Sequence, residues 1–214
     1  MARRSGAADV VMATGELPRR VYPVVFVVDV SGSMADDAKI DVLNGALLGA
    51  VARLAEISDP EFTIHVAVLT YGDDAKIVQP LAPATSIDLP RLEASGRSNL
   101  GSALTLLCEV LAKSEPTDTA HYPAIILISD GYPTQRYDDE LEAAGNLERF
   151  QSATRAAVRI GTDASDDHLV DFCRGSLGVL DASDLATVPE VLLRVSRIVE
   201  ASAGFASSSR LRRG

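Results

Sequence analysis

Tryptophan is absent from this sequence, and cysteine is nearly absent. Aromatic residues make up only 5% of the 214 residues, and the two cysteines, Cys108 and Cys173, lack the spacing of a metal finger. Two cysteines are too few for a disulfide framework, so we expect both to be buried or half-buried thiols in helices. With so few aromatic side chains, the core must be built mainly from Val, Leu, Ile and Ala.

Long apolar runs and a leader pattern are also missing. The longest apolar stretch, residues 21–30, is too short to span a bilayer and contains Asp29. Arg3 and Arg4 are followed by a segment that contains Asp9 and no apolar run, so we expect no secretory signal. These absences favour a cytoplasmic protein with no membrane partner.

An excess of basic residues is likewise lacking. The chain has 20 Lys and Arg against 30 Asp and Glu, for a formal net charge of −10. Since nucleic-acid affinity comes largely from neutralising phosphates, we expect no nucleic-acid partner. The 47% hydrophobic and 23% charged contents are those of a globular protein, and the length suits one α/β domain.

Apolar runs alternate with amphipathic segments along the chain. The runs 24–28 and 124–128 are continuous, as in strands buried on both faces of a parallel sheet. Residues 62–70 alternate and lead through a tight turn into 75–78, which predicts a hairpin at a sheet edge. Further strands are expected at 154–161 and 177–180, and helices from a cap at Asp36 through Leu54 and at 91–94, 101–113, 139–150, 166–173 and 190–202.

This alternation predicts the fold class and the domain limits. We expect a Rossmann-like, doubly wound α/β fold, with a mostly parallel sheet, one antiparallel edge strand and helices on both faces. The domain should span residues 18–205. Residues 1–17 are expected to be a poorly ordered N-terminal extension, and 206–214 a basic C-terminal tail without regular structure.

Polar turns follow the two most buried predicted strands. Asp29, Ser31 and Ser33 lie on the turn after 24–28, Asp130 lies just past 124–128, and Ser98 lies on a turn before a helix. Ligands of an open parallel sheet bind beyond the carboxyl ends of its strands, so we expect these five side chains to converge. Carboxylates and hydroxyls are hard oxygen ligands that suit Mg²⁺ or Mn²⁺ and do not suit zinc.

So few charged ligands would leave the cation electrophilic, with a position open for an outside carboxylate. We therefore predict a protein partner that supplies an acidic side chain to the metal. The net charge of −10 would repel such a partner at long range, so the short-range pull of the ion must hold it. Met34 and Tyr132 flank the predicted ligands and are candidate partner contacts.

Three segments of the sequence resemble the motifs of a known family. They are Val28–Met34 (VDVSGSM), Gly96–Leu104 (GRSNLGSAL) and Leu127–Thr134 (LISDGYPT). They look like the metal-ion-dependent adhesion site, or MIDAS, of von Willebrand factor A (vWA) domains. The resemblance implies that Ser31 and Ser33 coordinate the ion directly, and that Asp29 and Asp130 act through water or hydrogen bonds. Ser98 stands where the family has Thr, which leaves tighter or weaker metal binding open.

The resemblance covers most of the chain, from about Leu17 to about Phe205. Within the family, residues 22–23, 75–81 and 95–96 look most like bacterial TerY-like, tellurium-resistance-associated stand-alone vWA proteins. That likeness implies a non-enzymatic intracellular adaptor in tellurium-resistance or stress signalling. It also implies a protein kinase and a metal-dependent protein phosphatase as partners.

Other functions remain open. A Mg²⁺-dependent, phosphatase-like hydrolase is one, because haloacid dehalogenase-like phosphatases also place an Asp after a buried strand. Those enzymes need a second Asp two positions on, where this chain has Ser31, and no nucleophile elbow or phosphate-cradling loop is present. A subunit of a chelatase, or an ATPase partner, would use the same metal site within a larger assembly. A secreted adhesin is disfavoured by the missing signal and the sparse cysteines.

Overall fold

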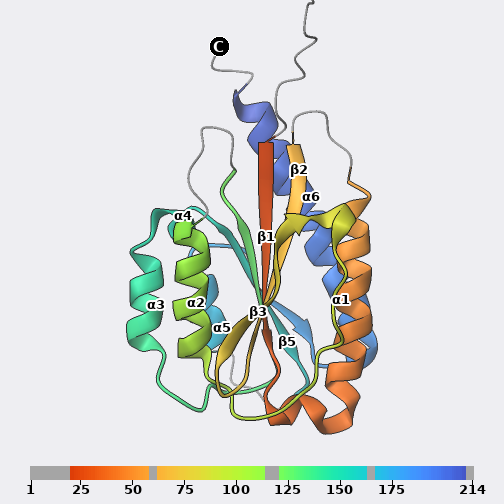
Figure 1. The fold of residues 1–214 in the computed structure, drawn as a ribbon, viewed down its shortest axis with the longest axis vertical. Helices are drawn as coiled ribbons and strands as arrows, with labels where there is room; N and C mark the ends of the chain where they lie inside the picture. Colours follow the sequence, from red (N-terminus) through yellow and green to blue (C-terminus); the bar gives the residue numbers. More distant parts are fainter. Residues whose placement is uncertain (1–19, 58–61, 114–120, 163–166, 211–214) are drawn as a thin grey trace, which may run out of the picture.

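The computed structural model describes residues 20–57, 62–113, 121–162 and 167–210, with the backbone alone for 203–210. Strands in these ranges form one sheet in the order β3-β2-β1-β4-β5-β6 (Figure 1). The strands are β1 (Arg20–Asp29), β2 (Phe62–Tyr71), β3 (Ala75–Pro83), β4 (Ala124–Ser129), β5 (Thr154–Ile160) and β6 (Gly178–Ala182). Every neighbouring pair runs parallel except β2 and β3, so the predicted antiparallel edge hairpin is confirmed.

Helices cover both faces of the sheet. They are α1 (Lys39–Ala55), α2 (Leu100–Lys113), α3 (Asp138–Gly145), α4 (Glu148–Gln151), α5 (Asp167–Cys173) and α6 (Val188–Arg210). Short 3₁₀ segments are η1 (Gly32–Ala38), η2 (Ala84–Ser86) and η3 (Leu185–Thr187). Helices α1 and α6 lie on one face and α2, α3, α4 and α5 on the other (Figure 1), which confirms the predicted doubly wound fold.

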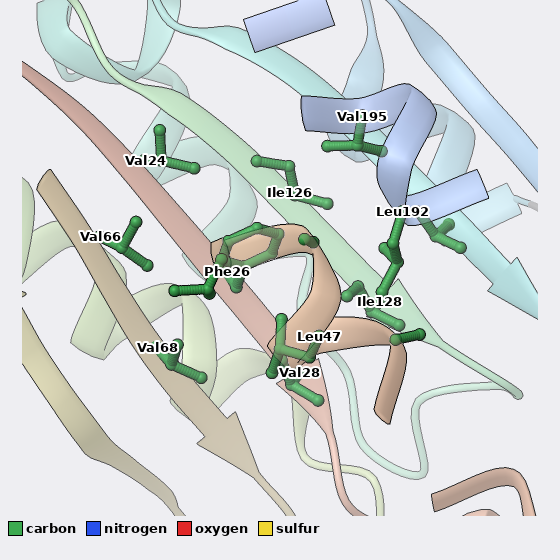
Figure 2. Close-up of a cluster of buried hydrophobic side chains, with 14 of the residues drawn as sticks. Val24, Phe26, Val28, Leu47, Val66, Val68, Ile126, Ile128, Leu192 and Val195 are labelled. Atoms are coloured by element: carbon green, nitrogen blue, oxygen red, sulfur yellow. The ribbon is translucent and has the colours of Figure 1, made fainter. Parts of the chain in front are cut away.

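Strand β1 supplies side chains to both halves of the core. Val24, Phe26 and Val28 pack toward Leu47 of α1 and Leu192 of α6 (Figure 2). The intervening valines of the strand pack on the opposite face, against α2. A strand buried on both faces reads as a continuous apolar run, which is why this segment lacks the polar alternation of a half-exposed strand.

The short helix predicted at 91–94 does not form, and that prediction was wrong. Asn44 of α1 donates from Nδ2 to the carbonyl oxygen of Leu92 at 3.0 Å, and its Oδ1 accepts from the Leu92 N–H at 2.8 Å. These two bonds satisfy the backbone of Leu92 as a neighbouring strand would. The segment therefore lies across α1 without a helical turn of its own.

Two helix limits also differ from the sequence prediction. The predicted helix 139–150 is broken into α3 and α4, because Leu147 adopts an extended conformation two residues after Gly145. Helix α6 runs to Arg210, so residues 206–210 of the predicted tail are helical. The N-terminal extension 1–17 lies outside the described residues, and the domain limits stay predictions.

The two cysteines and the helix lengths bear on two further expectations from the sequence. Cys108 is half-buried and Cys173 is buried, and both are free thiols, as predicted. No helix in the described ranges combines the length and apolar character that a membrane span requires.

Candidate metal centre

The candidate site lies where the strand order reverses. The chain passes from β1 to β2 on one side and later returns to β4 on the other, so the carboxyl ends of β1 and β4 flank a crevice. Asp29 is the last residue of β1, and Asp130 directly follows β4. Beyond Asp29 the chain enters η1 and α1 at the lower edge of the view in Figure 1.

The Asp29 carboxylate is fully buried and surrounded by hydrogen-bond donors. Its Oδ1 accepts the Ser31 N–H at 2.8 Å. Its Oδ2 accepts the hydroxyls of Ser98 at 2.8 Å and Ser129 at 3.0 Å. Burial raises the pKa of Asp29, and these hydrogen bonds oppose the rise. The carboxylate thus orients two hydroxyls and one backbone amide.

The Asp130 carboxylate has one hydroxyl and one cationic partner. Its Oδ1 accepts the Ser33 hydroxyl at 2.9 Å, and its Oδ2 accepts the Lys39 ammonium at 2.8 Å. The Asp130 and Lys39 side chains are 0% and 7% exposed, so this ion pair is shielded from water. Such a pair interacts more strongly than one on the surface.

The Ser31 and Ser33 hydroxyl oxygens lie 3.1 Å apart. Around Mg²⁺, with metal–oxygen distances of about 2.1 Å, adjacent oxygens of an octahedron lie about 3.0 Å apart. The spacing of the two hydroxyls therefore fits neighbouring ligand positions on one cation. Both border a pocket of about 370 Å³, which is also lined by Lys39, Ser98, Asp130 and Tyr132.

The structure thus brings together all five residues predicted as metal ligands. Asp29 joins Ser31 and Ser98, Asp130 joins Ser33, and Ser31 lies beside Ser33. No group of three or more His, Cys, Asp or Glu side chains suited to a metal occurs among the described residues. A cation held here would rely on hydroxyls, two carboxylates and solvent.

Backbone hydrogen bonds fix the three loops against one another. The Gly32 N–H donates to the Gly96 carbonyl at 2.9 Å, and the Thr134 N–H donates to the Ser98 carbonyl at 2.8 Å. Gly96 has a φ of +76°, and a Cβ built there would lie 2.6 Å from Oδ2 of Asp73. The positive φ and this close approach favour glycine at this position, where the loop that carries Ser98 passes the β2–β3 turn.

The two candidate partner contacts differ in exposure. Tyr132 is 58% exposed beside the pocket, with its ring centroid 6.4 Å from that of His168. Met34 is 0% exposed and belongs to the core that α1 covers, so its prediction as a partner contact is corrected. The Met34 side chain points into the core and packs η1 against it.

Two residues of the site were not predicted from the sequence. Ser129 is the last residue of a buried strand, and a hydroxyl there reads as an ordinary strand end. Lys39 is the first residue of α1, where the helix macrodipole disfavours a cation. That disfavoured position was the available signal for Lys39, whereas no sequence signal singled out Ser129.

Comparison with known proteins agrees with this architecture. Residues 24–133 match the family model of the von Willebrand factor type A domain. The Escherichia coli (strain K12) protein YfbK is 23% identical over 199 residues, which cover 85% of this chain and 33% of YfbK. The chain therefore spans about a third of that relative.

Two solved structures illustrate the shared fold. A von Willebrand factor type A protein from Catenulispora acidiphila has a TM-score of 0.68 at 19% identity, over 85% of this chain and 43% of that one. Proximal thread matrix protein 1 of the mussel byssus, with a zinc-occupied MIDAS motif, has a TM-score of 0.62 at 17% identity, over 85% and 46%. The match to the family model over residues 24–133, more than half of the chain, shows that the chain belongs to the von Willebrand factor type A domain family.

Proposed function

We propose that this chain is a metal-ion-dependent protein-binding module with a MIDAS. In it, Asp29, Ser31, Ser33, Ser98 and Asp130 hold a divalent cation that bridges to an acidic side chain of a protein partner. The observation that carries the proposal is the pair of hydroxyls, Ser31 and Ser33, spaced at 3.1 Å on the edge of an open pocket. The carboxylates of Asp29 and Asp130 next to them are buried.

Hydrogen bonds to the two carboxylates orient the hydroxyls of Ser33 and Ser98. The Ser98 hydroxyl donates a hydrogen bond to Oδ2 of Asp29, and the Ser33 hydroxyl donates one to Oδ1 of Asp130. Each hydroxyl oxygen therefore keeps lone pairs that are not engaged by the carboxylate. The carboxylates place negative charge next to these oxygens, which strengthens their attraction for a cation.

The ligand chemistry favours Mg²⁺ or Mn²⁺. All five groups are oxygen donors, and hard cations such as Mg²⁺ and Mn²⁺ prefer oxygen ligands. The mussel protein carries zinc at its MIDAS, which supports a divalent cation and makes zinc a necessary arm of the test. First-row affinity generally rises from Mn²⁺ toward Zn²⁺, so supply as well as ligand type decides which ion is bound.

The partner and the cellular setting extend the proposal. The exposed ring of Tyr132 offers an apolar contact next to the pocket, while the cation supplies the attraction for a carboxylate.

The TerY-like resemblance at 22–23, 75–81 and 95–96 supports a cytoplasmic adaptor in tellurium-resistance signalling, with a protein kinase and a phosphatase as partners. Genes for such enzymes next to this one would support that assignment, and their absence would count against it.

One alternative is weakened by the geometry. A hydrolase that used Asp29 as a nucleophile would need a free carboxylate oxygen at the pocket. Here Asp29 is 0% exposed and both of its oxygens accept hydrogen bonds. A chelatase or ATPase-partner role would use the same metal site.

The test combines metal binding with partner capture. Calorimetry with Mg²⁺, Mn²⁺ and Zn²⁺ should show binding by the wild type and its loss in Asp29→Ala and Ser31→Ala. Tagged protein should capture partners from cell extract with Mg²⁺ and release them with EDTA. The exposed Asp88 provides a matched control, and Asp88→Ala should behave as the wild type. Capture of the same partners under all these conditions would refute the metal bridge.

A further inference from the structure

We propose that Lys39 is a built-in counter-cation of the metal centre, which weakens the hold on the bare cation and makes it depend on an outside anion. This inference rests on the proposed function and adds a residue that controls it. The Lys39 ammonium lies 2.8 Å from Oδ2 of Asp130 and 3.4 Å from the carbonyl oxygen of Ser33. The Asp130 carboxylate would therefore interact with both the Lys39 ammonium and the bound cation.

Local structure places Lys39 there against several backbone preferences. It begins α1, where the helix macrodipole repels a cation. The two residues before it, Asp37 and Ala38, have φ values of 52° and 58°, a region that disfavours side chains with a Cβ. Strained backbone of this kind persists where the surrounding structure requires it, often at functional sites.

Packing also fixes the lysine stem. A Cβ built at Gly161, just past β5, would lie 3.2 Å from Cε of Lys39, so glycine leaves room for the stem. Lys39 is only 5% exposed, and its side chain is enclosed by the loops of the site. The ammonium is thus held as a fixed charge of the centre and does not act as a solvated surface lysine.

The charges of the site explain the consequence. The Asp29 and Asp130 carboxylates with the Lys39 ammonium leave one net negative charge, and the opposite charges of Asp36 and Arg97, which also line the pocket, cancel. A divalent cation therefore makes the loaded site net positive. Without the ammonium, the same cation would be neutralised by the two carboxylates alone. Lys39 therefore lowers affinity for the cation by repulsion and leaves positive charge for an incoming carboxylate. Cation and acidic partner would bind cooperatively.

The experiment measures Mn²⁺ affinity by electron paramagnetic resonance, with and without acetate as the anion probe, at constant ionic strength. Lys39→Met should bind Mn²⁺ at least about tenfold more tightly than the wild type without acetate. Acetate should tighten Mn²⁺ binding less in Lys39→Met than in the wild type. Lys113→Met, which removes a lysine whose side chain is 78% exposed, should leave both quantities unchanged.

A double variant keeps the test independent of folding. Lys39→Met leaves a buried carboxylate unpaired, whereas Lys39→Met with Asp130→Asn removes both charges of the pair and should bind Mn²⁺ no more tightly than the wild type. Equal Mn²⁺ affinity in wild type and Lys39→Met, or an equal gain in the double variant, would overturn the role of Lys39 alone. No Mn²⁺ binding by the folded wild type would overturn the proposed function as well.

Discussion

The Asp29 carboxylate is buried and surrounded by hydrogen-bond donors, and no cationic side chain among the described residues forms an ion pair with it. Ser31, Ser98 and Ser129 each direct a proton toward it. Hydrogen bonds of this kind offset part of the desolvation of a charge, and the remainder raises the pKa of Asp29. Donors that surround a buried carboxylate without a paired cation are what the proposed metal site requires.

Asp29→Asn should therefore separate stability from metal binding. In EDTA we expect the free energy of unfolding to change by no more than about 1 kcal/mol, because loss of the buried charge offsets the weaker acceptor. Saturation of the wild type with Mg²⁺ at about 100 times Kd should add about 2.7 kcal/mol, and this gain should vanish in the variant. Thermal unfolding measures both. A Mg²⁺-dependent gain in Asp29→Asn equal to that of the wild type would contradict the assignment.

Cys173 gives a residue-scale prediction away from the site. Burial raises the pKa of its thiol from 9.0 to about 11, so the native protein holds almost no thiolate near pH 8. Iodoacetamide should leave Cys173 unmodified until the chain unfolds, as followed by mass spectrometry.

The raised pKa of the Cys173 thiol also predicts that the free energy of unfolding decreases at alkaline pH. The unfolded thiol ionises first, so its contribution to stability is complete below the ordinary pKa and is lost as pH rises toward about 11. Cys173→Ala should remove that part of the pH dependence. Labelling of native Cys173 at the rate of the unfolded chain would show that the thiol is not shielded.

Helix α1 is preceded by two residues in the left-handed region of backbone conformation. Its first residue, Lys39, pairs with Asp130 at the candidate metal centre. The left-handed conformations of Asp37 and Ala38 lead the chain into the helix. Ala38→Gly should raise the free energy of unfolding by up to about 1 kcal/mol, because glycine adopts positive φ without a Cβ penalty.

The same substitution in the interior of α1 is the control. Ala52 is exposed in the helix interior, so Ala52→Gly should lower stability by about 1 kcal/mol. Urea unfolding compares the two. If both changes were destabilising by equal amounts, Ala38 would not be strained.

Elements were predicted from the sequence where one physical rule decided the outcome. The apolar runs that became β1 and β4 were predicted correctly, because only a strand covered on both faces accommodates such short, continuous β-branched segments. The segment 91–94 was predicted wrongly, because the Asn44 side chain, distant in sequence, takes up the backbone groups of Leu92. Local propensity cannot contain that information.

The site was predictable to a similar extent. Asp29, Ser31, Ser33, Ser98 and Asp130 were brought together as expected, because strand ends of a parallel sheet share one edge. Met34 was misplaced, since flanking a ligand in sequence does not decide whether a side chain faces solvent. The pairing of Lys39 with Asp130 depends on tertiary geometry across 91 residues of sequence.

At the scale of the whole molecule, net charge and site charge act in opposite directions. The chain carries a formal charge of −10, whereas the loaded centre would be locally positive. Added salt screens the long-range repulsion between the protein and an acidic peptide.

The association rate of an acidic peptide with the Mg²⁺-loaded protein should therefore rise with NaCl concentration. Stopped-flow fluorescence measures this rate, and an uncharged peptide variant provides the control. Attractive steering would give the opposite slope, and such a result would contradict the view that the attraction for an acidic partner acts only at short range.

The close approach of the loops at Gly72 and Gly96 has a genetic consequence. A Cβ at Gly72 would lie 2.8 Å from the Ser95 carbonyl oxygen, and one at Gly96 would collide with the Asp73 carboxylate. In a mutational scan selected for partner binding, both glycines should therefore be as intolerant as Asp29, although neither contributes a ligand. The sensitive positions would include the contact between the β2–β3 turn and the Ser98 loop, so the map would extend beyond the proposed ligands.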